Sequence, residues 1–295
     1  MKISLWLPNT IPFDETLSLA RWAEAAGYDG IWYADHLMPN QADGSVDGRD
    51  TLECWTVLAA LGALVPRVRL VSMVSPVTIH HPVLLTKRAA TVSQFAAGRT
   101  VLGLGAGWQV NEHRAYGFDL PEAGPRVDRF AEALELVHTL VRSDRTTYRG
   151  TYYQLDDAPF APKPVGGMPL LVGTASPRMQ RLTARWADEW NTWGDPTVVA
   201  AATERFTAAC DREQRDPATV RRSAQALMFL GDPGAAALEG RTLSGSPEQL
   251  IHSLGLYQQQ GLHEFALPGF TLGRTPAERL DTLEALHAAV LSHFI

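Results

Sequence analysis

Short apolar runs alternate with amphipathic stretches along the whole chain. The runs whose composition predicts strands are 3–7, 30–34, 69–74, 100–104, 169–173, 189–193, 223–230 and 264–268. The stretches with apolar residues at helical spacing are 14–26, 52–65, 82–97, 127–142, 177–187, 197–213, 247–260 and 276–294. Glycine follows several of these stretches and proline opens others, as is usual at helix ends. Eight strand and helix repeats without a linker predict one (β/α)8 TIM barrel, an α/β fold, over residues 1–295.

Residues 144–168 interrupt this alternation. The sequence from Tyr148 to Tyr152 has the pattern of a small hairpin, and a proline-rich loop follows it. Because the segment comes after the fourth helix, we interpret it as a short insertion in the fourth repeat and not as a second domain. Active sites of such barrels form at the carboxyl ends of the strands, so residues that follow the strands are the first candidates for chemistry.

The composition narrows the class of protein. Hydrophobic residues make up 45% of the chain, and a net charge of −6 without clustered Lys and Arg argues against a nucleic-acid partner. The first apolar run is too short for a signal peptide, and the longest, 56–65, cannot span a membrane. Cys54 and Cys210 lack the spacing of a metal or redox motif. We therefore expect a cytoplasmic protein with no membrane partner.

The segment 170–179 has the pattern of a strand, a tight turn and a helix start. Ser176 suits the N-cap and Pro177 the first helical position. Small residues before them let a ligand approach the backbone, and the helix N-terminus favours an anion. The predicted phosphate site consists of Gly173, Thr174, Ala175, Ser176 and Arg178. The alternative is an ordinary capped turn that binds nothing.

Histidines follow the second and third predicted strands. His36 is the first catalytic candidate, because a histidine at a strand end can exchange a proton near neutral pH, and Asp35 could orient or tune a neighbour. The alternative is that both residues only stabilise the barrel rim. His80 could reach the barrel mouth and line a substrate pocket. Its neighbour His81 does not make a metal site with it, since no third ligand lies at suitable spacing.

A glycine-rich run, 103–107, ends the fourth strand. Its GxGxG spacing fails the dinucleotide-binding fingerprint, which requires GxGxxG in the first strand and helix unit. Glycines at a strand end instead let the backbone pass close to a flat ring system, with Trp108 as a wall of the pocket. The alternative is a tight barrel rim on which Trp108 packs.

Taken in order, these strand ends resemble the luciferase-like monooxygenase superfamily, and within it the oxidoreductases that depend on the deazaflavin coenzyme F-420 (F420). The segments that carry the resemblance are 32–36, 75–87, 98–113, 116–118, 161–164 and 173–188. The resemblance implies that the barrel mouth holds an isoalloxazine-like ring and that the segment 174–178 holds its phosphate. It also implies a non-prolyl cis peptide bond at Ser72–Met73, which places both residues against the ring.

The resemblance further assigns roles to single residues. Asp35 and His36 match the catalytic pair of the family. The positions that match cofactor contacts after strand four are Gly105, Ala106, Gly107 and Asn111. Sugar-phosphate dehydrogenases of the family have an acidic residue where this chain has Trp108, and an aromatic residue where it has Asn40. We therefore do not expect a sugar phosphate as the substrate.

The function that follows is hydride transfer between F420 and a small organic substrate, with His36 donating or accepting the accompanying proton. One alternative is a monooxygenase that binds reduced FMN supplied by a separate flavin reductase. Another is a barrel that binds a flavin or deazaflavin without turning it over. A homodimer is a possible assembly, and no metal is expected.

Overall fold

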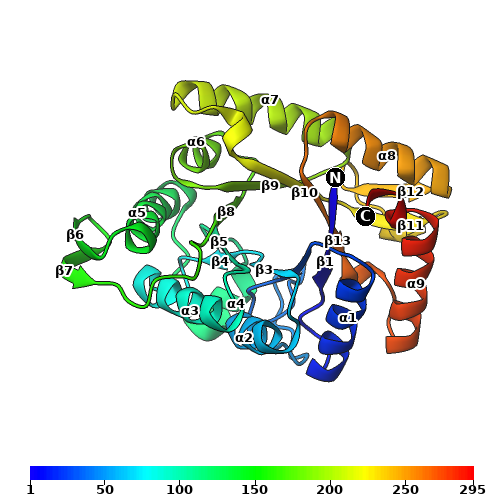
Figure 1. The fold of residues 1–295 in the computed structure, drawn as a ribbon, viewed down its shortest axis with the longest axis horizontal. Coiled ribbons are helices and arrows are strands. Elements are labelled where there is room, and N and C mark those ends of the chain that lie inside the picture. The colour runs from blue at the N-terminus through cyan, green and yellow to red at the C-terminus, as the bar shows by residue number, and fades with distance from the viewer.

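The structure is a computed structural model that describes residues 1–295, and a closed parallel barrel forms its centre (Figure 1). The barrel strands are β1 (Lys2–Leu7), β2 (Gly30–Tyr33), β3 (Arg69–Ser72), β4 (Ser75–Pro76), β5 (Thr100–Gly105), β8 (Leu170–Gly173), β9 (Glu189–Trp193), β10 (Arg221–Gln225) and β13 (Glu264–Pro268). The strand order is β3-β2-β1-β13-β10-β9-β8-β5-β4, and pairing of β3 with β5 closes the ring. The predicted (β/α)8 barrel is therefore confirmed.

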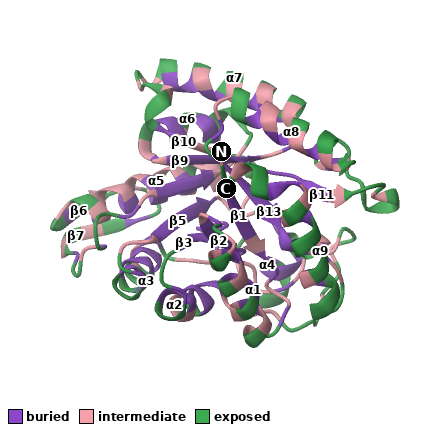
Figure 2. Cartoon of the chain, turned by 45° about the vertical axis from the view of Figure 1, so that its right-hand side comes forward, coloured by how far each residue is buried: buried purple, intermediate pink, exposed green.

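Helices surround the barrel with their apolar faces inward, so that in Figure 2 the strands are buried and the outer helix faces are exposed. They are α1 (Phe13–Ala25), α2 (Cys54–Leu64), α3 (Pro82–Phe95), α5 (Ala123–Arg142), α6 (Pro177–Trp186), α7 (Pro196–Arg212), α8 (Pro247–Gln259) and α9 (Pro276–Ala289). Side-chain caps at Ser176 and Asp195 fix the starts of α6 and α7. No helix combines the length and apolar character that crossing a membrane requires.

Two features differ from the expected elements. The predicted strand 223–230 is two strands, because after β10 the chain changes partner and β11 (Leu227–Leu230) pairs with β12 (Thr242–Gly245) in a separate sheet. No Gly, Pro or Asn marks a turn within residues 223–230, so the sequence gives no sign of this change of partner. The short helix α4 (Val110–Tyr116) was not predicted, since seven residues are too few to show a helical period.

The segment that we interpret as an insertion contains a hairpin that is longer than the predicted one at 148–152. An antiparallel hairpin of β6 (Arg145–Arg149) and β7 (Gln154–Pro159) follows α5. The Glu132 carboxylate of α5 accepts hydrogen bonds from the backbone N–H groups of Thr151 and Tyr152, both at 2.8 Å. This contact fastens the hairpin turn to the helix layer, away from the strand ends.

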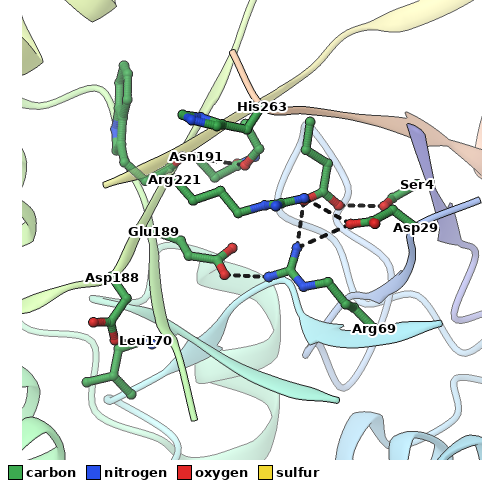
Figure 3. Close-up of polar contacts among 12 residues, drawn as sticks. Ser4, Asp29, Arg69, Leu170, Asp188, Glu189, Asn191, Arg221 and His263 are labelled. Carbon is green, nitrogen blue, oxygen red and sulfur yellow. Dashed lines mark hydrogen bonds and ion pairs between the residues drawn. The ribbon is translucent and has the colours of Figure 1, made fainter. Parts of the chain in front are cut away.

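Charged side chains fill the amino-terminal end of the barrel (Figure 3). Glu264 of β13 is fully buried and contacts Arg69 at 2.8 Å and Arg221 at 3.0 Å, while Arg221 also pairs with Asp29 at 2.9 Å. Burial alone would raise the pKa of Glu264, but the two guanidinium groups hold it below its ordinary value. Glu189 contacts Arg69 as well. We call these five residues the barrel floor. It closes one end of the barrel, so chemistry is left to the carboxyl ends of the strands.

Candidate active site

A bulge between β3 and β4 shapes the mouth of the barrel. The Met73–Val74 peptide bond is cis. The expected cis bond at Ser72–Met73 was therefore wrong by one position, because a motif match places the bulge in a segment and not at one bond. Met73 is buried in the barrel and Val74 is partly exposed at its mouth.

Glycines of β5 make room for this bulge. A Cβ atom at Gly103 would lie 1.9 Å from the Ser72 carbonyl oxygen, and one at Gly105 would lie 2.6 Å from Val74 Cγ2. Ser72 also binds Gly103 through its hydroxyl, which accepts from the Gly103 N–H at 2.9 Å. These glycines are thus required by the protein's own packing, whatever ligand approaches them. Ala106 and Gly107 follow at the partly exposed rim.

His36 lies at the carboxyl end of β2 and pairs with a carboxylate from α4. Its Nδ1 is 2.9 Å from Glu112 Oε1, and the other oxygen of Glu112 accepts the Leu37 N–H at 2.8 Å. Glu112 is fully buried, whereas one fifth of the His36 side chain is exposed. The rings of Trp108 and His36 pack nearly at right angles, with 5.6 Å between centroids, and Trp108 is 56% exposed.

The Glu112 carboxylate determines which ring nitrogen of neutral His36 carries the proton. A carboxylate beside Nδ1 favours the tautomer in which Nδ1 carries the proton, so Nε2 remains as the acceptor. Glu112 was not predicted to be the partner of His36. The signal was weak, because Glu112 follows the glycine run by several residues and lies on an unpredicted helix.

Asp35 belongs to a separate buried network. Its Oδ2 accepts from the Ser75 hydroxyl at 2.5 Å, and the Trp55 indole donates to that hydroxyl at 2.9 Å. His80 Nε2 lies 3.0 Å from the same oxygen, close enough for an ion pair but poorly aligned for a hydrogen bond. Burial by itself would raise the pKa of Asp35, but His80, Ser75 and the charge of His36 hold it below its ordinary value.

Asp35 and His36 therefore do not form a contacting pair. No hydrogen bond joins their side chains, and each histidine has its own carboxylate. His80 lines a cleft of about 760 Å³ between α2 and α3, together with Leu37, Arg88 and Phe118. The two expected pocket residues thus lie apart, with Trp108 beside His36 and His80 in this lateral cleft.

The Asn111 side chain is engaged within the protein. Its amide donates to the carbonyl oxygens of Pro39 and Ser45, both at 3.0 Å, and its Oδ1 accepts the Glu112 N–H. Asn111 is buried and fastens the loop after β2 to α4. Through its bond to the Glu112 N–H, Asn111 helps to hold Glu112 in place beside His36.

The turn after β8 has the predicted cap. Ser176 Oγ accepts from the Met179 N–H at 3.4 Å, and Thr174 Oγ1 accepts from the Ser176 N–H at 3.1 Å. The backbone N–H groups of Ala175 and Arg178 make no hydrogen bond. The Arg178 guanidinium pairs with Asp128 of α5, and both side chains are half-exposed.

Comparison with known proteins identifies the family. The family model described as luciferase-like monooxygenase matches residues 1–264, so the chain belongs to this family. Among curated relatives, an F420-dependent glucose-6-phosphate dehydrogenase of Microbacterium testaceum is 34% identical over 201 residues, which cover 67% of this chain and 57% of the relative. An F420-dependent hydroxymycolic acid dehydrogenase of Mycobacterium tuberculosis is 28% identical over 225 residues, covering 76% and 61%.

Solved structures agree on the fold. An F420-dependent secondary alcohol dehydrogenase in complex with an F420–acetone adduct superposes with a TM-score of 0.83 at 20% identity and covers 98% of both chains. The monooxygenase RslO1 from Streptomyces bottropensis gives 0.82 at 20% identity and covers 100% of both. In the sequence comparisons with the curated relatives, this chain spans about half to three fifths of the relatives' own length.

Proposed function

We propose that this protein is an F420-dependent oxidoreductase that transfers a hydride between the deazaflavin and a small organic substrate. The observation that carries the proposal is the His36 and Glu112 pair at the carboxyl end of β2, in a chain of the luciferase-like family. The names of the curated relatives support F420 over FMN. Monooxygenases occur among the similar structures, so reduced FMN with oxygen is the alternative to test.

The residues present fit a flat ring that carries a phosphate. Gly173 is partly exposed and has no side chain, so the backbone beside Val74 can be approached closely. The free N–H groups of Ala175 and Arg178, with the N-terminus of α6, suit a phosphate. When bound, the deazaflavin would supply the carbon that accepts or donates the hydride.

A side chain of the protein would transfer the proton that accompanies the hydride. His36 Nε2 would take the proton from a substrate hydroxyl, or return it in the reverse direction. Glu112 would stabilise the imidazolium through its bond to Nδ1 and would fix the ring by its second bond to Leu37. Asp35 would act through the position of the β2 end, since its oxygens face Ser75 and His80.

We also propose a substrate other than a sugar phosphate. The exposed Trp108 presents an apolar wall next to His36, at the position where the family resemblance implies an acidic side chain in sugar-phosphate dehydrogenases. An uncharged alcohol or carbonyl compound suits this surface better than a phosphorylated sugar. The protein would work in the cytoplasm and would form a homodimer.

The test is binding followed by turnover. The apoprotein is titrated with F420 and separately with FMN, and the ring fluorescence is followed. Tight binding of F420 and its reduction by members of a panel of alcohols would support the proposal. Binding of FMN alone, with oxygen consumption on addition of reduced FMN, would support the monooxygenase. Binding of either ring without turnover of any substrate would support a non-catalytic barrel.

A further inference from the structure

Two buried amide side chains face each other across β9 and β10. Asn191 Nδ2 donates to Gln225 Oε1 at 2.7 Å and to the Ser223 hydroxyl at 3.0 Å. Asn191 and Gln225 are 1% and 0% exposed. Alternation along the strands puts them on the same side as Glu189 and Arg221 of the barrel floor, so they point into the barrel.

This pair leaves one acceptor and one donor unused. Asn191 Oδ1 and Gln225 Nε2 have no hydrogen-bond partner, although both are buried. Exchanging oxygen and nitrogen in both amides does not remove the deficit, because it leaves Asn191 Nδ2 and Gln225 Oε1 free instead. Either way an unmatched acceptor lies beside an unmatched donor, which is rare for buried groups in a folded protein.

Gly173 lies between the bulge at the mouth and this pair. A Cβ atom at Gly173 would lie 3.5 Å from Val74 Cγ1, 3.8 Å from Met73 Cε and 3.9 Å from Asn191 Oδ1. Gly173 pairs with Asn191 in the β8–β9 register and is itself partly exposed. Because residue 173 has no side chain, no atom of it stands between the bulge and the free oxygen of Asn191.

We propose that Asn191 and Gln225 bind the imide edge of the ring system, the side on which an N–H group lies between two carbonyl groups. One amide would accept from the N–H and the other would donate to a carbonyl oxygen. This inference rests on the proposed function. Since deazaflavins and flavins share this edge, the pair would orient the ring in the mouth without choosing between the two cofactors.

The first test changes the protein. Gln225→Glu keeps an acceptor for Asn191 Nδ2 but replaces the free N–H group by an oxygen, so we expect F420 and FMN to bind about tenfold more weakly or worse. Gly173→Ala meets no close contact and should fold like the parent, yet it places a methyl group beside the free oxygen of Asn191 and should weaken the binding of both rings similarly. Gly255→Ala, on α8 with open space around it, is the matched control and should bind like the parent.

The second test changes the ligand. FMN methylated at the imide nitrogen should bind the parent about tenfold more weakly than FMN, whereas Asn191→Leu should bind both forms equally weakly. Thermal unfolding without ligand separates loss of binding from loss of folding. Two results together would overturn the inference and leave the proposed function intact. Gln225→Glu and Gly173→Ala would bind both rings as tightly as the parent, and the parent would bind methylated FMN as tightly as FMN. A parent that binds neither ring would overturn both.

Discussion

Replacing Glu112 by Gln tests whether a buried carboxylate makes His36 an effective base. The side chain keeps its size and can still accept the Leu37 N–H, but the negative charge beside Nδ1 is lost. A hydrogen bond to a charged group contributes about 1.5–3 kcal/mol. If that stabilisation acts on the imidazolium formed during proton transfer, kcat should fall about 10- to 150-fold, with little change in the KM for F420.

The assay is F420 reduction at saturating cofactor, with an alcohol identified in the panel and measured across pH. Histidine labelled with ¹⁵N reports the tautomer independently, and we expect the proton to leave Nδ1 in part of the Glu112→Gln molecules. The matched control is Glu132→Gln, which removes a carboxylate that holds only the hairpin turn and should leave kcat unchanged.

The two residues should also be strongly coupled. Glu112→Gln added to His36→Asn should cost little beyond His36→Asn alone, because the carboxylate acts through the imidazole. Full kcat in Glu112→Gln, or losses that add in the double variant, would refute the proton role assigned to this pair.

Three further predictions follow from the same geometry. Asp35→Asn should lower the free energy of unfolding, measured in urea titrations, by about 1–3 kcal/mol. The pKa of Asp35 is held below its ordinary value of 3.8. The parent should therefore be more stable than the variant by this full amount above pH 3.8, and the difference should disappear as the pH falls through the lowered pKa. Ser176→Asp keeps a cap but places a negative charge in the predicted phosphate site, so it should weaken F420 binding strongly in fluorescence titrations without lowering Tm, and parent-like binding would place the phosphate elsewhere. Gly103→Ala should destabilise the protein by about 3 kcal/mol or more because its Cβ would meet the Ser72 carbonyl oxygen, and a Tm equal to that of the Gly255→Ala control would contradict the packing of the bulge.

Sequence patterns were sufficient for the barrel and for the cap at Ser176, because both depend on local periodicity and end signals. They could not show that Asp35 and His36 serve different networks, although neighbouring residues in extended chain point to opposite sides. Glu112 reaches His36 only through the packing of α4 against the loop after β2. Asn191 and Gln225 were also missed, since an amide in a strand has no motif and its unused atoms become visible only in three dimensions.

The barrel floor also limits when the barrel can close as the chain is synthesised. Glu264, which contacts both Arg69 and Arg221, lies 195 and 43 residues from them along the chain. Until the strand that carries Glu264 has been synthesised, the two arginines lack their shared partner and β1 lacks its neighbour on that side. During translation the barrel therefore closes late, through contacts of long sequence separation, and a chain that stops before residue 264 cannot close it.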